Sequence, residues 1–411
     1  MTIPISVVHI ITKLELGGAQ QVALFTVSHL DTSRFRPILV IGESGYLDAE
    51  AKAMPDIECY QVSSMVRPIR PFQDILALHQ LTKLLTLLRP MIVHTHSSKA
   101  GILGRWAARL SGVPIIVHTI HGFGFTPYQQ PAVRRLLIAL ERSTARFTTR
   151  FFVVSEANRR MGINLGLFSA ESSSLLRPGI DISTFRQVRV DAAAKKRELG
   201  VGPEQPLIGM IAPFKPQKAP LDFVRAAARI VQHRPDARFL LVGDGDLRMA
   251  IEQEIDRLAL SPSFVLTGWR RDIPDIMHCL NVFVLTSRWE GLPRVYLEAM
   301  ASGIPVVGTR VDGAAEVIRD GWNGYLTEPG DITKLADRIL DLLNDPEKAK
   351  RMGEHGRSLP PEFDIYEMVR QQEREYEQLV ADRERRVDSS HGAGYEALAA
   401  REPSNLPAKH P

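Results

Sequence analysis

Cysteine is almost absent from this sequence of 411 residues, which contains only Cys59 and Cys279. Two cysteines are too few for a disulfide framework, so the sequence predicts a protein of a reducing compartment. No stretch approaches the roughly 20 uninterrupted apolar residues that a membrane-spanning helix needs. The apolar start, residues 1–12, has no positive charge before Lys13. We therefore expect a first strand rather than a signal peptide, and a cytoplasmic protein.

Common metal and dinucleotide motifs are missing as well. Neither His-Glu-x-x-His nor Cys-x-x-Cys occurs, so no metal site and no cofactor are predicted. Gly17-Gly18 and Gly243-Asp244-Gly245 both lack the spacing of a dinucleotide fingerprint. Asp244 and Asp246 have the D-x-D spacing that chelates a metal-bound nucleotide in some enzymes. An aspartate at a helix N-cap is the favoured interpretation of this pair.

What the sequence does contain is an uneven charge. Apolar residues make up 44% and charged residues 24%, as in ordinary globular proteins, and the length suggests two or three domains. The net charge is +4, but residues 1–180 carry 19 basic and 11 acidic side chains. A basic N-terminal part suits an anionic partner such as a membrane surface or a phosphorylated acceptor. Basic residues interleaved with aromatic ones are absent, so nucleic acid is not predicted as a partner.

Short β-branched runs alternate with longer runs of helical period, which predicts parallel α/β layers. Strands are expected at 5–11, 38–41, 91–95, 115–120, 151–154, 207–211, 238–242, 264–267, 282–286 and 305–308. Helices are expected at 19–30, 71–88, 99–110, 132–146, 221–232, 247–258, 293–301 and 333–343. The pattern predicts two doubly wound units of similar size.

The alternation of strands and helices stops at 177–206, a stretch with Pro and Gly that predicts a linker with a short helix. We therefore expect an N-terminal domain at 1–180 and a C-terminal domain at 181–361. Residues 362–386 have a charged helical pattern. Residues 387–411 are rich in Ser, Gly, Ala and Pro, which predicts a disordered tail.

Two glycines, Gly17 and Gly18, stand between the first expected strand and its helix. They would let the backbone approach a ligand, and the helix start would offer free N–H groups to a phosphate. A tight strand-to-helix turn without a ligand explains them equally well. On their own, these glycines do not decide between the two interpretations.

A stronger motif follows the strand expected at 282–286. Glu290 is followed by Gly-Leu-Pro and then by a helix that carries Glu298. Eight residues are a little over two helical turns, so both carboxylates can face one side. Carboxylates accept hydrogen bonds from sugar hydroxyls, and the intervening N–H groups suit a phosphate. Acidic residues at a helix start can also be simple dipole complements, but the cluster of features favours a binding site.

Together these motifs resemble those of the retaining glycosyltransferases of family 4, which have the GT-B fold. Glu290 and Glu298 match the E-x7-E motif of that family. The resemblance covers roughly residues 5–380 and is carried by motifs in family order: Gly17-Gly18-Ala19-Gln20, Val93-His94-Thr95-His96, Thr119-Ile120-His121-Gly122, Leu241-Val242-Gly243-Asp244-Gly245 and Gly313 to Gly324. It implies two Rossmann-like domains facing an interdomain cleft, with the helix after Pro361 crossing back to the first domain.

The resemblance also implies roles for individual residues. Glu298 would hold the ribose of a nucleotide-sugar donor, and Glu290 would lie near its sugar hydroxyls. Lys218 would neutralise the diphosphate, and His121 would reach the sugar from the opposite domain. The backbone would contact the sugar, the diphosphate or the base at the remaining donor positions, Gly17, Gly18, Gly268, Trp269, Gly291 and Leu292.

The sequence departs from the family at one donor position. The family has an arginine five residues before the lysine, where this chain has Pro213. Lys215 is the nearest basic residue, and we expect Lys215 and Lys218 to pair the leaving diphosphate together. Lysine lacks the bidentate fork of arginine, so the diphosphate would be held less rigidly.

A basic amphipathic helix is predicted at 132–150. Arg135, Arg142 and Arg146 share one face, with Leu136, Leu137, Leu140 and Phe147 toward the other. A helix packed on its sheet with a solvated arginine face is one interpretation. The other is contact with anionic lipid or a lipid-diphosphate acceptor. Ser97 and Lys99, at the edge of the expected cleft, are further candidates for acceptor binding.

The resemblance thus implies a metal-independent retaining transferase of the hexosyl or N-acetylhexosaminyl type. It would use a nucleotide-sugar, most simply a UDP-sugar, and a lipid-linked or surface-polysaccharide acceptor, as in lipopolysaccharide synthesis. Attack from the leaving-group face is the implied route. Peripheral attachment to the inner face of the plasma membrane would fit the basic lobe. A UDP-sugar epimerase of similar fold and a non-catalytic binder of nucleotides or glycans are the alternatives.

Overall fold

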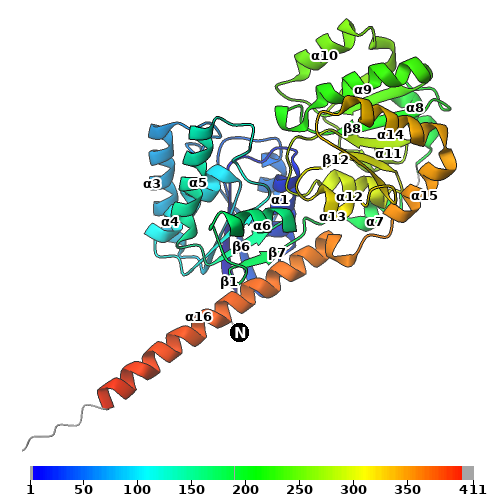
Figure 1. Ribbon diagram of the computed structural model, residues 1–411. Helices are drawn as coiled ribbons and strands as arrows, with labels where there is room; N and C mark the ends of the chain where they lie inside the picture. The colour runs from blue at the N-terminus through cyan, green and yellow to red at the C-terminus, as the bar shows by residue number, and fades with distance from the viewer. Residues whose placement is uncertain (1–2, 189, 400–411) are drawn as a thin grey trace, which may run out of the picture.

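In the computed structural model, which describes residues 3–188 and 190–399, the chain forms two lobes, each built on one parallel β-sheet (Figure 1). The sheet of the first lobe has seven strands in the order β3-β2-β1-β4-β5-β6-β7. Its strands are β1 Ile5–Ile11, β2 Phe35–Ile41, β3 Glu58–Gln61, β4 Ile92–His96, β5 Ile115–Ile120, β6 Arg150–Val153 and β7 Ser173–Leu175.

The sheet of the second lobe has six strands in the order β10-β9-β8-β11-β12-β13. They are β8 Leu207–Ile211, β9 Arg238–Val242, β10 Phe264–Gly268, β11 Val282–Leu285, β12 Val306–Thr309 and β13 Gly324–Thr327. In both sheets the strand order reverses beside the first strand, between β1 and β4 and between β8 and β11. Ligands of open parallel sheets bind outside the carboxyl ends of the strands at such a reversal.

Helices cover both faces of each sheet. In the first lobe they are α1 Gly18–His29, α2 Asp48–Ala53, α3 Pro71–Leu88, α4 Ser98–Leu110, α5 Pro131–Ala145 and α6 Glu156–Asn164. In the second lobe they are α9 Pro220–His233, α10 Arg248–Arg257, α11 Ile273–Met277, α12 Arg294–Ala301, α13 Ala314–Val317, α14 Ile332–Asn344 and α15 Pro346–Gly356, with short 3-10 turns η1 Pro216–Lys218 and η2 Ser261–Ser263.

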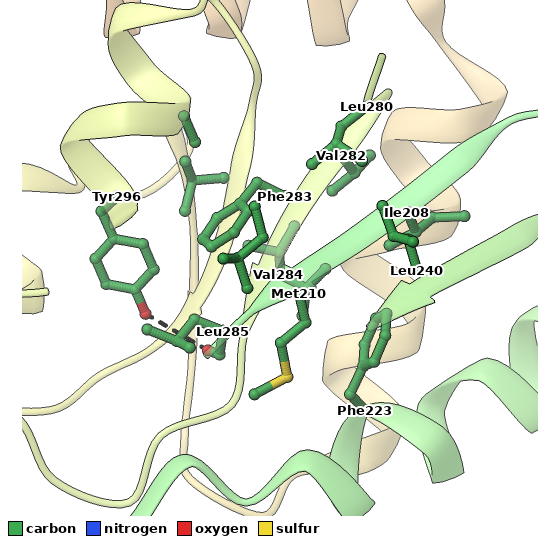
Figure 2. Packing of buried hydrophobic residues seen from close by; sticks show 14 of the residues in the cluster. Ile208, Met210, Phe223, Leu240, Leu280, Val282, Phe283, Val284, Leu285 and Tyr296 are labelled. Carbon is green, nitrogen blue, oxygen red and sulfur yellow. Dashed lines mark hydrogen bonds between the residues drawn. The ribbon is translucent and has the colours of Figure 1, made fainter. Parts of the chain in front are cut away.

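The strands of the second lobe are apolar on both faces because helices cover both sides of its sheet. All four residues of β11 are buried. Figure 2 shows Phe283 and Leu285 among residues of β8 and β9, with Tyr296 of α12 beside them. The Tyr296 hydroxyl donates to the carbonyl of Leu285 at 3.4 Å. This core fixes the position of α12 relative to the end of β11.

The segment between the sheets holds two short helices, α7 Ile182–Arg186 and α8 Ala192–Glu198, where the sequence predicted one. Asp181 and Asp191 cap them by accepting hydrogen bonds from main-chain N–H groups. Ile180, Phe185 and Leu199 are buried in the core of the second lobe. The segment is therefore packed on that lobe, and the domain limits drawn from the sequence stay a prediction.

The last helix, α16 Ile365–Ala399, follows the turn η3 Pro361–Phe363 and lies against the first lobe, then extends away from both lobes (Figure 1). Met368, Val369 and Tyr376 are buried in one cluster with Val7 and Phe152 of the first sheet. The core of the first lobe is thus completed by residues from the other end of the chain.

The disordered tail predicted from the sequence at 387–411 stays a prediction. The helix α16 continues through Arg386 to Ala399, and residues 400–411 lie outside the described residues. The first proline after the helix start is Pro403, so nothing before it removes a backbone donor. The glycines Gly392 and Gly394 each cost about 1 kcal/mol in a helix, which weakens it without ending it.

Candidate active site

A cavity of about 1320 Å³ lies between the lobes, at the strand-order reversals of both sheets. Segments that follow β1, β4 and β5 line it from the first lobe, and segments that follow β8 and β11 line it from the second. Among its lining residues are most of those predicted from the sequence: Gly17, Gly18, Ser97, His121, Lys215, Lys218, Trp269, Glu290, Gly291, Leu292 and Glu298.

Glu290 and Lys218 form an ion pair at this cavity. Glu290 follows β11 and is only 7% exposed, and Lys218 ends η1, which follows the neighbouring strand β8. The Ser287 hydroxyl donates to the same carboxylate at 2.5 Å. Asp312, which the sequence analysis did not single out, accepts the Glu290 N–H at 2.6 Å. Burial raises the pKa of Asp312, although the Glu290 N–H opposes that shift.

Glu298 lies eight residues further on, in α12, and is only 8% exposed. Its carboxylate has no hydrogen-bond partner among the described residues. Burial raises the pKa of Glu298, and the nearby guanidinium of Arg294 only partly counters that effect. A buried carboxylate that lines a cavity and lacks partners has hydrogen-bonding capacity left for a ligand.

Arg294, at the start of α12, is a lining residue that sequence reasoning missed. Its guanidinium donates to the Gly179 carbonyl at 3.0 Å and to the Gln21 side chain in α1 at 2.7 Å. Burial lowers the pKa of Arg294. The sequence signal that could have identified Arg294 is a basic residue at the first position of a mostly apolar helix. The side chain ties the second lobe to the first beside Glu298.

Lys215 also lines the cavity, and its ammonium pairs with Glu15 of the first lobe at 3.0 Å. Glu15 further contacts Arg67 at 3.3 Å and Lys13 at 3.6 Å. Burial acts to raise the pKa of Glu15, but the hydrogen bond and charge of Lys215, with Arg67 and Lys13, leave it below its ordinary value. The second cation proposed for a diphosphate is therefore held by a carboxylate across the cavity.

The lobes meet at Gly291 and His121. A Cβ built on Gly291 would lie 2.1 Å from the His121 carbonyl oxygen, which is an impossible contact. On the other side, Gly122 has φ +135° and faces the main chain of Gly291. The absence of a side chain at residue 291 is what allows this approach.

The loops after β1 and β4 complete the first-lobe side. Gly17 precedes α1 with an extended φ of −115°, so its backbone does not require glycine. Ser97 adopts φ 65° and ψ 160°, a conformation that costs of order 1–3 kcal/mol outside glycine. Its hydroxyl lies 3.0 Å from that of Thr12. Such strain beside a cavity is typical of functional sites.

Two predicted residues lie elsewhere. Lys99 does not line the cavity, and its ammonium pairs with Asp74 at 2.6 Å and with the Pro68 carbonyl. Its role in acceptor binding stays a prediction. Gly268 also lies off the cavity, with its carbonyl bound by the Gly243 N–H at 2.9 Å, while the next residue, Trp269, lines it.

The interpretation of Asp244 as a helix cap is wrong. The helix α10 starts at Arg248 without a side-chain cap. The Asp244 carboxylate instead accepts the Gly245 N–H at 2.8 Å and lies 3.5 Å from Arg248. Asp244 and Asp246 both line the cavity.

The arginines of α5 border a separate hollow of about 450 Å³. Arg135, Arg142 and Arg146 are exposed along it, as the amphipathic pattern predicted. On the apolar side, Leu136 and Leu140 are 55% and 36% exposed, whereas Leu137 and Phe147 pack against buried clusters of the first lobe. The helix therefore exposes arginines on one face and two leucines toward another. None of the helices in the described part of the chain is apolar over a length that could span a bilayer.

Two doubly wound sheets that face one cavity, with paired glutamates and a lysine at their strand ends, define a glycosyltransferase of the GT-B class. The family model "Glycosyltransferase Family 4" matches residues 16–184, and the model "Glycosyl transferases group 1" matches residues 191–359. The chain belongs to this family, as its motifs predicted.

Individual relatives agree with this assignment. The chain is 33% identical to the UDP-Gal:alpha-D-GlcNAc-diphosphoundecaprenol alpha-1,3-galactosyltransferase of Escherichia coli, over 83% of this chain and 88% of that protein. It is 33% identical to the N-acetyl-alpha-D-glucosaminyl L-malate synthase of Bacillus anthracis, over 71% and 75%. The crystal structure of Anabaena Alr3699/HepE in complex with UDP and glucose has a TM-score of 0.79 at 21% identity and covers 91% of this chain and all of that one, which shows the shared fold.

Proposed function

We propose that this protein transfers a hexosyl or N-acetylhexosaminyl group from a UDP-sugar to a lipid-linked or polysaccharide acceptor, with retention and without a metal ion. The observation that carries the proposal is the single cavity that Glu290, Glu298, Lys218 and His121 line from both lobes. The names of two relatives support it, since one acts with UDP-Gal on a diphosphoundecaprenol-linked sugar and another was crystallised with UDP and glucose.

In this proposal Glu298 binds the ribose hydroxyls, because its buried carboxylate has acceptor capacity and no hydrogen-bond partner within residues 3–188 and 190–399. Lys218 binds the diphosphate. An ammonium has three donors, and Glu290 uses one of them, so Glu290 orients Lys218 and leaves donors for phosphate oxygens. Glu290 also borders the sugar, as do the N–H groups near Gly291 and Leu292 and, from the other lobe, His121.

Breaking the bond between the sugar carbon and the phosphate oxygen places negative charge on the diphosphate. Preorganised cations and N–H dipoles are the strongest means of stabilising that charge. Lys218, Lys215 and the N-terminus of α1 at Gly17-Gly18 supply them here. The acceptor oxygen attacks from the face that the diphosphate leaves, and its proton passes to the departing phosphate oxygen. Glu290 then acts in binding and electrostatics rather than as a nucleophile.

We assign the donor to the C-terminal domain (181–361) and the acceptor to the N-terminal domain (1–180). Arg135, Arg142, Arg146 and the exposed leucines beside them provide a surface that suits an anionic membrane, where a lipid-linked acceptor resides. Ser97 borders the cavity on the acceptor side. The protein would thus work as a peripheral enzyme on the inner face of the plasma membrane.

The test is a panel of UDP-, GDP- and ADP-sugars scored by thermal shift and slow donor hydrolysis, followed by transfer to undecaprenyl-diphosphate-linked sugars in the presence of EDTA. We expect one UDP-sugar to stabilise the protein, and we expect a glycosylated lipid only when the acceptor is present. An isomerised sugar formed without an acceptor would point to an epimerase. Binding without any turnover would leave a non-catalytic binder, and loss of turnover in EDTA would contradict metal independence.

A further inference from the structure

A chain of buried imidazoles runs through the first lobe from α16 to the cavity. His9 lies on β1 beside His94 of β4, and His96 follows two residues later on the same face. All three are at most 2% exposed. The His9 Nδ1 and His96 Nε2 atoms are 3.0 Å apart, and the His96 Nδ1 and His121 Nε2 atoms are 3.1 Å apart. His121 lines the cavity, so the chain ends at the candidate active site.

Two hydroxyl groups close the chain at its inner end. The Tyr376 hydroxyl of α16 lies 2.5 Å from His94 Nδ1 and 3.4 Å from His9 Nε2, and it accepts the Gln372 amide N–H at 2.7 Å. The Thr119 hydroxyl lies 2.6 Å from His94 Nε2. Every ring nitrogen of His9, His94 and His96 therefore has a partner, while His121 Nδ1 has none among the described residues.

The protons of this chain can be placed by following its donors. Burial lowers the pKa of His9 to about 3 and that of His121 to about 4, and it also depresses the pKa values of His94 and His96, so all four rings are neutral. A neutral imidazole carries one N–H and one bare nitrogen, so the direction of one hydrogen bond determines the next.

Among the described residues the Thr119 hydroxyl has His94 Nε2 as its one hydrogen-bond partner, and a buried donor without an acceptor costs about 1–3 kcal/mol. His94 therefore carries its proton on Nδ1 and donates to Tyr376. With the amide of Gln372 also donating to that oxygen, the Tyr376 proton is left for His9 Nε2. His9 then donates from Nδ1 to His96, and His96 donates from Nδ1 to His121 Nε2.

We propose that Thr119, His94, Tyr376, His9 and His96 are positioning residues that fix His121 in the tautomer protonated at Nδ1. The opposite direction leaves the Thr119 hydroxyl without an acceptor. His121 thereby offers a neutral N–H donor to an oxygen of the substrate in the cavity. This functional part rests on the proposed transfer from a nucleotide-sugar, whereas the tautomer itself does not.

The test is the ¹⁵N spectrum of the full chain with ¹⁵N-labelled histidine, with His121 assigned by its loss in His121→Asn. Two-bond couplings distinguish a protonated Nδ1 from a bare one without any substrate. We expect His121 to be protonated at Nδ1 in the wild type. A bare Nδ1 would overturn the proposal, and so would stoichiometric zinc or copper bound by His9, His94 and His96 in the purified protein.

Three variants distinguish residues that fix the His121 tautomer through hydrogen bonds from residues that only support the fold. Thr119→Val and Tyr376→Phe keep the shapes of the side chains but interrupt the chain, so we expect the His121 signal to shift to a mixture of tautomers. Tyr60→Phe on β3 alters a residue outside the histidine chain and should leave the His121 signal unchanged.

Thr119→Val and Tyr376→Phe should also lower kcat/KM about tenfold if about a tenth of the molecules keep His121 in the competent tautomer. An unchanged His121 tautomer in folded Thr119→Val and Tyr376→Phe would refute the coupling. A changed tautomer with full activity would instead refute the role of His121 in transfer.

Discussion

Glu298 carries the clearest prediction at the scale of a single residue. Glu298→Gln keeps the shape but replaces one carboxylate oxygen with an amide NH2 and removes the charge, so the charge-assisted bonds to a ribose, worth about 1.5–3 kcal/mol, are lost. We expect the donor Kd to rise by roughly 10- to 150-fold, measured by calorimetry. Glu328→Gln, at an exposed residue, is the matched control. Equal donor affinity of Glu298→Gln and wild type would remove Glu298 from the donor site.

The same substitution should change stability in a pH-dependent way. Burial raises the folded-state pKa of Glu298 above its ordinary value of 4.5. Because the folded state binds this proton more tightly, the carboxyl group stabilises the fold at pH values below its unfolded-state pKa. This stabilisation is lost as the pH rises through the folded-state pKa. The free energy of unfolding of Glu298→Gln should therefore increase relative to that of the wild type as the pH rises above about 4.5. Denaturant titrations between pH 4 and 8 measure it, and parallel curves would contradict it.

Lys215 has two possible partners, Glu15 and the substrate diphosphate. Lys215→Ala should lower kcat/KM by at least about tenfold if the ammonium stabilises the leaving group. Glu15→Gln, the control, releases Lys215 without removing it and should leave donor affinity unchanged or tighter. Near wild-type turnover of Lys215→Ala would show that the lysine serves only the ion pair between the lobes.

Which site residues can be predicted depends on how local their geometry is. Glu290 and Glu298 lie within one strand–loop–helix unit, so their spacing alone indicates a shared face. Asp312 acts through a hydrogen bond to the Glu290 main chain, and Arg294 acts through Gln21 in the other lobe. These contacts join residues far apart in sequence, and no periodicity encodes them. The partners of His121 escaped sequence reasoning for the same reason.

At the scale of elements, the central strands of both sheets could be predicted because they are rich in apolar and β-branched residues. The edge strands β3, β7 and β13 were not predicted, since their short sequences ECYQ, SSL and GYLT contain no continuous apolar run. For residues 387–411 the prediction of disorder rests on composition, which predicts solvation better than backbone conformation, and it stays a prediction.

The helix α5 gives a prediction about membranes. Replacing its three arginines with glutamine should weaken binding to anionic vesicles by on the order of a hundredfold, since each basic residue near the surface contributes about 1 kcal/mol. The control removes three exposed cations from the second lobe: Arg229, Lys334 and Lys350. Binding of the wild type should fall steeply with salt. Equal binding to neutral vesicles, or equal loss in the control, would defeat the proposal.

At the scale of the whole molecule, the contact of Gly291 with His121 determines how closely the lobes can approach. Gly291→Ala places a Cβ 2.1 Å from the His121 carbonyl, so the lobes must separate or the loop must shift. We expect kcat to fall at least tenfold, because closure excludes water and aligns the groups that act on the substrate.

Small-angle scattering of Gly291→Ala should report a larger radius of gyration with donor present. Gly321→Ala is the control for destabilisation as such, because its φ of +77° strains an alanine while nothing lies within 4 Å of the added Cβ. An unchanged radius with unchanged kcat would mean that the lobes already work further apart than in this structure.

The burial of α16 in the first lobe has a consequence for biosynthesis. Ile365, Met368 and Tyr376 complete a core whose other members, such as Val7 and Ile92, are translated several hundred residues earlier. The N-terminal half of the nascent chain therefore leaves the ribosome with an uncovered apolar sheet face. The core of the first lobe can therefore be completed only after α16 has been translated.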